Sequence, residues 1–298
     1  MQLNKLGKSD IKVSQLGFGA MSLSGEDWLA DMNLIKEAHS KGINYFDTAD
    51  LYTKGENEKL LGEALKGIRQ DIILATKVGN VWRPDGSGWD WNVSKDYINK
   101  AIDASLVRLK TDYIDLYQLH GGTNADNYEE VIETLERLKD AGKIRAYGLS
   151  SIRPNVFQYY SEHSAIISNM MQFSILDTRP RAYFTSFESN DVSVIARGAL
   201  AQGVLIGKSA KPYLTADVST VAQLQEQISS IAKYHGVSNL AIALYYVLQN
   251  SIVASALVGI RTTVQLLELL NAYEEISTLN ANQLTHLGFD SHYKEHID

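Results

Sequence analysis

Two kinds of segment alternate along the chain. Short apolar runs alternate with longer stretches in which apolar residues recur at helical spacing beside charged ones. The apolar runs predict strands at 15–20, 44–49, 72–77, 114–120, 144–150, 169–174, 192–197 and 253–259. The longer stretches predict helices at 27–40, 56–66, 94–109, 128–140, just after Pro154, and at 182–188, 220–234, 238–249 and 263–273.

These segments make eight strand–helix units, with two helical stretches in the connection after the seventh strand. The strands are nearly continuous in apolar residues, as in a parallel sheet that is covered on both faces. Several helices end in glycine before the next strand, at Gly42, Gly67 and Gly142. Eight such units in about 250 residues fit a (β/α)8 barrel. We therefore predict an α/β fold, a TIM barrel, as a single domain over residues 1–298.

A doubly wound sheet is the alternative fold, because it uses the same alternation. Its dinucleotide fingerprint is incomplete here, since the pair Gly17 and Gly19 has no third glycine at the required spacing. The opening residues 5–17 do not belong to the alternating pattern. They predict a small β-hairpin that turns at residues 7–10 and plugs the N-terminal end, the bottom, of the barrel.

Composition narrows the class of protein. The net charge of −7 argues against a surface for nucleic acid or anionic membrane. The chain has no cysteine, which excludes disulfides, thiolate metal ligands and a cysteine nucleophile, and we expect no metal site. No apolar segment resembles a secretory signal or a bilayer-spanning helix. We expect a cytoplasmic protein, a monomer or small homo-oligomer, that acts on small molecules.

Four polar residues lie at or just after the ends of three successive predicted strands. Asp47 lies at the end of the second strand with Tyr52 just past it, Lys77 ends the third strand and His120 ends the fourth. Each has a simpler explanation: a helix cap for Asp47, a loop lysine for Lys77, a hydrogen-bonded core histidine for His120 and packing for Tyr52. The carboxyl ends of barrel strands form one rim, where catalytic groups gather. Their shared position favours a catalytic set.

The four side chains also fit one chemistry. An ammonium beside a phenol favours the ionised phenol, so Lys77 would prepare Tyr52 for proton donation, and Asp47 would hold Lys77 in place. His120 would donate a hydrogen bond to a substrate carbonyl oxygen, and Tyr52 would act as general acid on that oxygen. The set therefore predicts carbonyl reduction by hydride. A protein supplies no hydride donor of its own, so a nicotinamide cofactor is implied.

At these residues the sequence resembles the aldo-keto reductases, especially bacterial members described as general oxidoreductases. The stretches 44–52, 75–79 and 116–122 match that family's catalytic tetrad at Asp47, Tyr52, Lys77 and His120. The resemblance runs from the hairpin to about Asn271. It implies a TIM barrel that binds NADP(H) in extended form across the rim.

The resemblance also carries cofactor contacts. Ser150, Ser151 and Gln172 match the positions that hold the nicotinamide carboxamide, although Ser151 replaces the usual asparagine. Arg261 would engage the 2′-phosphate with its bidentate donor fork, which favours NADPH over NADH. Glu268 would contact the adenine, and Leu269 replaces an asparagine beside it. The remaining matched positions are Asp47, Gly19, Ala20, Met21, Gly198, Leu200, Gln202, Lys208, Gly259 and Gln265.

Arg197 stands where many relatives have the aromatic ring that stacks on nicotinamide. A guanidinium plane also stacks on rings. Its positive charge would repel an oxidised nicotinamide and so favour the reduced cofactor. The simpler explanation is a salt bridge at the end of a strand.

A long loop, residues 79–94, follows Lys77 and carries Trp82, Trp89 and Trp91. A loop that leaves the catalytic rim is well placed to line a pocket, and aromatic walls suit apolar or aromatic aldehydes and ketones. We expect Trp82, Trp89 and Trp28 in the substrate pocket. Trp91 is as well explained by pinning the loop to the barrel. The segment 207–220 is polar and predicts a lid over the cofactor.

Two other functions remain open. One is an NADP(H)-sensing regulatory subunit with little turnover, as in channel-associated relatives that retain the tetrad. The other is a barrel isomerase or lyase in which Lys77 forms a Schiff base. The set of Asp47, Tyr52, Lys77 and His120 argues against the second.

Overall fold

The protein is a closed parallel barrel. The computed structural model describes residues 1–23, 25–280, 284 and 287–291. Within these residues the barrel strands follow one another around the ring in chain order, and β12 pairs back onto β3 with Leu257 opposite Gly17. They are β3 (Leu16–Gly19), β4 (Tyr45–Asp47), β5 (Ile73–Val78), β8 (Ile114–Leu119), β9 (Ile144–Leu149), β10 (Ser168–Gln172), β11 (Ser193–Arg197) and β12 (Val253–Val258). The predicted TIM barrel is confirmed, and the open doubly wound sheet is wrong.

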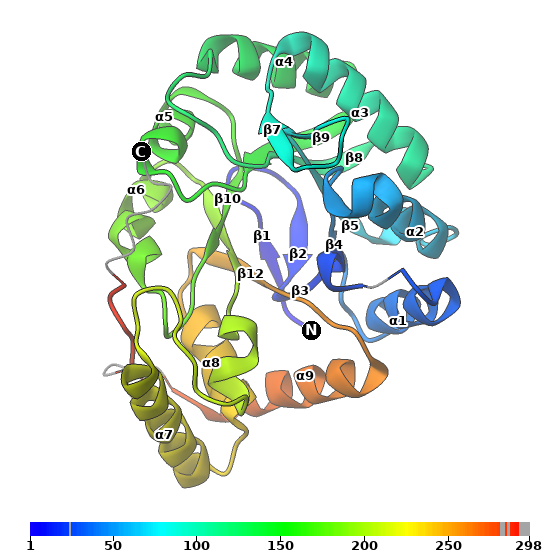
Figure 1. Cartoon of the computed structure of the whole chain (residues 1–298). Coiled ribbons are helices and arrows are strands. Elements are labelled where there is room, and N and C mark those ends of the chain that lie inside the picture. The colour runs from blue at the N-terminus through cyan, green and yellow to red at the C-terminus, as the bar shows by residue number, and fades with distance from the viewer. Residues whose placement is uncertain (24, 281–283, 285–286, 292–298) are drawn as a thin grey trace.

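Helices surround the barrel (Figure 1). Most begin at a residue whose side chain accepts a hydrogen bond from the first turn, as Asp27 does for α1 and Ser94 for α3. The helices are α1 (Trp28–Ser40), α2 (Glu56–Ala64), α3 (Lys95–Leu109), α4 (Tyr128–Asp140), α5 (Pro154–His163), α6 (Phe184–Ser189), α7 (Val218–His235), α8 (Asn239–Leu248) and α9 (Thr263–Glu275). Among the described residues, no helix has the length and apolar character needed to cross a membrane.

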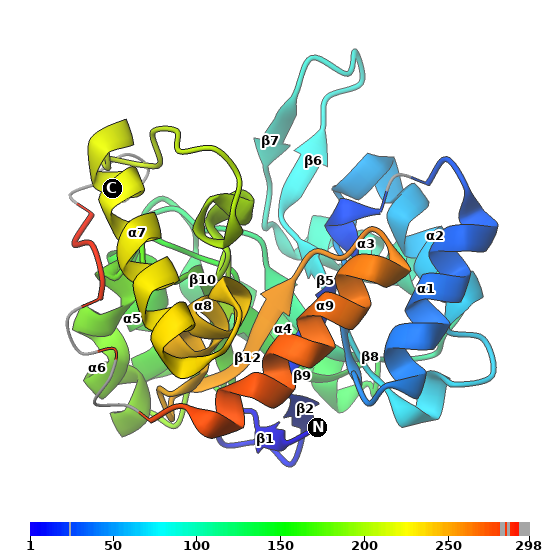
Figure 2. The same ribbon diagram turned by 90° about the horizontal axis from the view of Figure 1, so that it is seen from below.

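A hairpin of β1 (Leu3–Lys5) and β2 (Lys12–Ser14) lies across one end of the barrel (Figure 2), as predicted. Its turn is closed by a 2.9 Å hydrogen bond from the Leu6 amide to the Ile11 carbonyl. Leu6, Ile11 and Val13 are buried together with inward-facing residues of the barrel strands. This apolar plug leaves the opposite rim as the place for polar chemistry.

The segment after Lys77 differs from the predicted loop. It forms a second hairpin, β6 (Asn80–Trp82) and β7 (Trp89–Trp91), which rises from the rim at the end opposite the plug (Figure 2). Trp82 and Trp89 face each other across it, with ring centroids 5.7 Å apart. Such cross-strand aromatic pairs stabilise a two-stranded ribbon. The Pro-Asp-Gly run at 84–86 supplies its turn.

The plug is expected to contribute strongly to stability. Leu6 is 0 % exposed, so Leu6→Ala should lower the free energy of unfolding by about 2–5 kcal/mol, as large-to-small core substitutions do. Urea denaturation followed by circular dichroism measures it. Leu3→Ala, at a side chain that is 48 % exposed, is the matched control. Equal stability of the two variants would show that the hairpin is not part of the core.

Candidate active site

The four predicted catalytic residues meet on the rim opposite the plug. Asp47 ends β4, Lys77 lies in β5, and His120 directly follows β8. Strand register brings them to one level, because Asp47 lies opposite Ala75 of β5 and Lys77 lies opposite Gln118 of β8. Tyr52 begins the short helical turn η2 (Tyr52–Gly55) just beyond β4.

The Lys77 ammonium is the centre of the site and is only 1 % exposed. Its Nζ donates to Oδ1 of Asp47, to the Thr48 carbonyl at 2.7 Å and to the Tyr52 hydroxyl at 3.3 Å. All three ammonium protons therefore have an acceptor. Burial acts to lower the pKa of Lys77, but Asp47 and Tyr52 outweigh it and hold that pKa above its ordinary value. Lys77 stays charged, which argues against a Schiff-base role.

Asp47 is held on its other side. Its Oδ2 accepts hydrogen bonds from Nε2 of Gln118 at 3.0 Å and from the Tyr45 hydroxyl at 3.5 Å. Tyr45 and Gln118 were not among the predicted site residues. Both lie two positions before a predicted one, Asp47 or His120, and side chains two apart on a strand face the same way. That periodicity was the available signal.

His120 faces Tyr52 edge-on, with ring centroids 5.8 Å apart. Its main chain is fixed by a 2.8 Å bond from its amide to the Val78 carbonyl and a 2.9 Å bond from Asn80 Nδ2 to its own carbonyl. Burial, and then the charges of Lys77 and Arg197, lower the pKa of His120 to about 3. The ring is therefore neutral at physiological pH and keeps one N–H to donate.

Gln172 and Arg197 end adjacent strands, β10 and β11, and lie opposite each other. Arg197 Nη1 donates to Oε1 of Gln172 at 3.4 Å, and Nε2 of Gln172 donates to the Tyr213 hydroxyl at 2.7 Å. Among the described residues Arg197 forms no ion pair, so none of them supports the salt-bridge explanation for it. Tyr213, in the predicted lid, was missed because its partner is distant in sequence.

Ser150 and Ser151 directly follow β9. Ser151 is buried and its Oγ accepts from the Arg153 amide at 3.3 Å, while its main chain is bracketed by Asn169. Ser150, which is only partly buried, is the more accessible of the two serines.

The loop after β11 contains residues with positive φ angles and approaches Gln172 closely. Gly198 has a φ of +70°, which favours glycine, and a Cβ there would make a tight contact of 3.1 Å with Cγ of Gln172. Leu200 precedes η5 (Ala201–Ile206), and Gln202 has a positive φ of 59°. Lys208 Nζ donates to the Gln202 carbonyl at 2.8 Å, which turns its charge toward this loop.

The connection from β12 to α9 meets the end of β3. A Cβ on Gly259 would lie 3.0 Å from Cβ of Ser22, in the turn η1 (Ala20–Ser22) that follows Gly19 and contains Met21. Exposed residues here are Arg261, Gln265 and Glu268, and the Arg261 amide donates to Oε1 of Gln265 at 2.9 Å.

Leu269 is buried in the main core, away from this exposed face. Its departure from the expected asparagine is thus a core-packing feature of α9, because its side chain faces the core while that of the neighbouring Glu268 is exposed.

Two of the tryptophans anchor the β6–β7 hairpin through hydrogen bonds from their indole N–H groups. Trp82 Nε1 donates to the Leu51 carbonyl at 2.8 Å, which ties the β6–β7 hairpin to the residue before Tyr52. Trp91 Nε1 donates to Asp126 at 2.8 Å, so Trp91 pins the hairpin to the barrel. Trp89 is exposed, and Trp28 lines a cavity of about 300 Å³ with Thr53.

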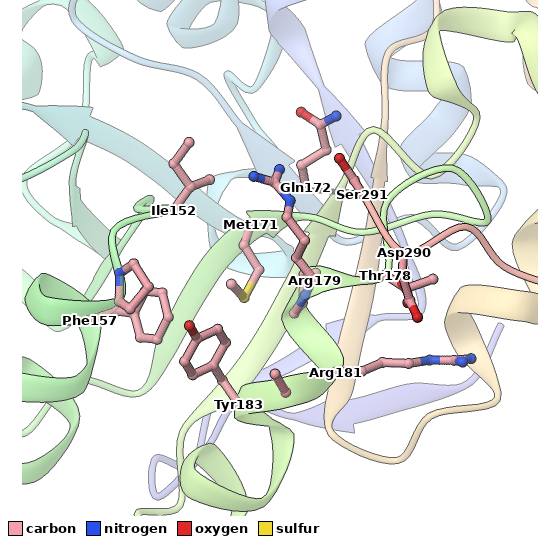
Figure 3. A pocket seen from close by; sticks show the side chains of 13 residues that line it. Ile152, Phe157, Met171, Gln172, Thr178, Arg179, Arg181, Tyr183, Asp290 and Ser291 are labelled. Carbon is pink, nitrogen blue, oxygen red and sulfur yellow. The ribbon is translucent and has the colours of Figure 1, made fainter. Parts of the chain in front are cut away.

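A second cavity, of about 450 Å³, opens beside Gln172 (Figure 3). Apart from Gln172, its lining was not predicted, because it comes from several elements that are brought together only in the folded chain. Its apolar wall is formed by Ile152, Phe157, Met171 and Tyr183, and its polar wall by Gln172 and Arg179.

The fold and site are those of a barrel oxidoreductase, and comparison with known proteins agrees. The model of the aldo/keto reductase family matches residues 15–288. The chain is 43 % identical to the uncharacterized oxidoreductase YqkF of Bacillus subtilis (strain 168), covering 100 % of this chain and 98 % of that protein. It is 42 % identical to the holo form of aldo-keto reductase AKR11C1 from Bacillus halodurans, with a TM-score of 0.91 and full coverage of both chains. This chain belongs to the aldo/keto reductase family.

A more distant relative carries a specific activity in its name. The NADH-specific methylglyoxal reductase of Escherichia coli (strain K12) is 28 % identical over 93 % of each chain. The chain is thus an oxidoreductase of a family that typically depends on NAD(P)H and acts on small molecules.

The neutral state of His120 can be tested directly. Because burial lowers its pKa to about 3, its imidazole should show no titration between pH 4.5 and 8 in ¹⁵N NMR spectra. His163, which is exposed, provides an internal comparison. A midpoint near 6.5 for the signal that disappears in His120→Gln would contradict the buried, neutral ring.

Proposed function

We propose that this protein is an NADPH-dependent carbonyl reductase that converts aldehydes and ketones to alcohols, with Tyr52 as the proton donor. The observation that carries the proposal is the contact between the buried Lys77 ammonium and the Tyr52 hydroxyl, at 3.3 Å, with Asp47 fixing that ammonium from behind. A positive charge at this point stabilises the phenolate that remains after proton donation.

The protein's own residues perform the proton half of the reaction. A reduced nicotinamide, when bound, supplies a hydride to the carbonyl carbon. The Tyr52 hydroxyl gives its proton to the carbonyl oxygen, and Lys77 stabilises the resulting phenolate until solvent restores the proton. The neutral His120 donates a hydrogen bond that orients the carbonyl and stabilises negative charge on its oxygen.

Three features support the cofactor assignment. Gln172 and Ser150 end neighbouring strands beside the catalytic set, which suits them to hold a carboxamide. The close approach of Gly198 to Gln172 suits a loop that must pass near a ligand. The chain also matches the holo form of AKR11C1 with a TM-score of 0.91, against 0.83 for its apo form.

Arg261 supports NADPH over NADH. Its side chain is exposed at the start of α9, and it forms no ion pair with the described residues that would occupy its donor fork. A guanidinium pairs with a phosphate through two parallel hydrogen bonds, which a ribose hydroxyl cannot match. Gln265 and Glu268, about one and two turns further along, are also exposed and suit the adenosine.

The substrate is proposed to enter between the β6–β7 hairpin and η1. Trp28 with its cavity, and the Trp82–Trp89 pair, supply apolar walls on this side of Tyr52. Such walls favour apolar or aromatic carbonyl compounds. Because Trp82 is also tied to Leu51, its replacement should disturb the turn that carries Tyr52 as well as substrate binding.

Replacing the proton donor tests the proposal. Tyr52→Phe should lower kcat for NADPH-dependent reduction of an aldehyde, diketone and quinone panel by about 10²–10⁴-fold, the usual contribution of a general acid. The dissociation constant for NADPH should stay within about twofold, since the phenol is not a predicted cofactor contact. NADPH oxidation and fluorescence titration measure the two quantities.

Wild-type turnover in Tyr52→Phe would make the proposed mechanism wrong. Tight NADPH binding by the wild type without turnover of any carbonyl compound would instead favour a regulatory, cofactor-sensing subunit.

The two cofactor arginines predict separate effects. Arg261→Ala should weaken NADPH binding by about tenfold or more while leaving NADH binding nearly unchanged, because one charged hydrogen bond is worth about 1.5–3 kcal/mol.

Arg197→Tyr should narrow the preference for NADPH over NADP⁺, since the guanidinium that repels an oxidised ring is gone. Fluorescence titration with the four nucleotides measures both. An unchanged ratio of NADP⁺ to NADPH affinity in Arg197→Tyr would count against the role assigned to Arg197.

A further inference from the structure

A cluster of ionisable side chains lies behind the loop that joins Asp47 to Tyr52. At its centre is Asp50, whose Oδ1 is shielded from solvent and accepts no hydrogen bond from the described residues. A buried carboxylate oxygen without a donor is costly in its charged form. The catalytic set described above does not use this group, although it lies only two residues before Tyr52 in the chain.

The arginine nearest to Asp50 in its electrostatic effect is already engaged. Arg108, from α3, donates through Nε to Oε2 of Glu58 at 2.6 Å and through Nη2 to Ser105 at 3.0 Å. Glu58, from α2, is fully buried and accepts from the Thr76 hydroxyl at 2.6 Å through its other oxygen. Both oxygens of Glu58 therefore have a donor, whereas Oδ1 of Asp50 has none among the described residues.

The cluster is tied closely to the catalytic turn. α2 and α3 pack side by side, and α3 contacts β5 (Figure 1). A Cβ on Gly55, at the end of η2, would lie only 2.7 Å from Cδ of Arg108, so the arginine stem runs directly against this turn.

The backbone makes the same connection. The Asp50 amide donates to the Lys77 carbonyl at 3.3 Å, and Lys77 Nζ returns a 2.7 Å bond to the Thr48 carbonyl. The loop that carries Asp50 is thus bonded twice to the lysine that contacts Tyr52.

The electrostatic environment of Asp50 is mixed. Burial, followed by repulsion from Glu58, raises the pKa of Asp50 to about 7, although Arg108 and Lys77 oppose the rise. The other titratable groups that face the cluster are Tyr97 of α3 and Tyr117 of β8, and burial together with the charge of Asp50 raises the pKa of each phenol. Both phenols stay neutral, so the charge of the cluster changes through Asp50.

We propose that Asp50 is a positioning residue for proton donation: its ionised carboxylate adds a negative charge behind the loop that carries Tyr52 and so slows the transfer of the phenolic proton. The coupling acts through Lys77, because its positive charge stabilises both the Asp50 carboxylate and the Tyr52 phenolate. An ionised Asp50 competes for that positive charge and disfavours the phenolate. The inference rests on the proposed carbonyl reduction, and it predicts faster reduction while Asp50 is protonated.

The first arm of the test needs no turnover. Because the pKa of Asp50 is raised above its unfolded value of 3.8, the folded protein binds more protons than the unfolded chain between about pH 4 and 7. Asp50 therefore makes stability fall as pH rises through that window. Asp50→Asn keeps the shape and removes the titration, so its Tm minus the wild-type Tm should grow by about 2–5 °C from pH 5 to pH 8.

Asp140→Asn, at the exposed end of α4, removes the same charge far from the rim and should show no such growth. A difference for Asp50→Asn that stays constant with pH would show that Asp50 does not titrate, and would overturn the proposal.

The second arm measures kcat for carbonyl reduction with saturating NADPH from pH 5.5 to 9. The wild type should fall by roughly threefold to tenfold through a midpoint near 7, the change expected for up to one pKa unit of interaction. Asp50→Asn should lose that step and keep the high rate, with KM for NADPH unchanged. Asp140→Asn should retain the step.

A step that persists in Asp50→Asn would overturn the coupling even if Asp50 titrates. An absence of carbonyl reduction in every variant, with the pH-dependent Tm difference intact, would instead refute the proposed function and, with it, the assigned role of Asp50 in proton donation.

Discussion

The whole site depends on keeping one ammonium charged inside the barrel. Removing a cation from water costs several kcal/mol unless its protons and charge are matched. Lys77 meets that condition with a carboxylate, a carbonyl and a phenol, and the carboxylate is in turn held by Gln118 and Tyr45. The acceptors come from β4 and the turn beyond it, and Lys77 comes from β5, so the parallel pairing of these two strands brings them together. The proton donation that we propose for Tyr52 depends on that arrangement.

The two ends of the barrel differ in role: one end is closed by an apolar hairpin, and the other carries the candidate site. The β1–β2 hairpin closes one end with apolar side chains, which supplies stability without polar cost. At the other end the β6–β7 hairpin rises from the rim and is braced twice, by Trp82 to Leu51 and by Trp91 to Asp126. A tryptophan whose indole N–H donates a structural hydrogen bond can still present its ring face to a pocket. The same residues can therefore hold the catalytic turn and shape the substrate entrance.

Much of this architecture is readable from the sequence. Apolar runs that alternate with helical segments predict the barrel, and Asp47, Lys77 and His120 are found because strand ends share a rim. Asp50 and Tyr213 are not found this way, since their importance comes from partners on other elements. The β6–β7 hairpin was missed because a Gly- and Pro-containing segment looks like a loop until its tryptophans pair. Leu269 shows the reverse, because a family position that suggests a ligand contact is filled here by a core side chain.

The most direct test of the central claim is the rate of carbonyl reduction without the buried charge. Lys77→Met alone would strand the Asp47 carboxylate, at a cost of about 3–5 kcal/mol, so the measurement belongs to the paired variant Asp47→Asn/Lys77→Met. Its kcat at saturating NADPH should fall at least 10²-fold, while circular dichroism stays close to wild type and NADPH still binds. A folded, NADPH-binding paired variant with wild-type kcat would contradict the account, because proton donation by Tyr52 would then need no neighbouring ammonium.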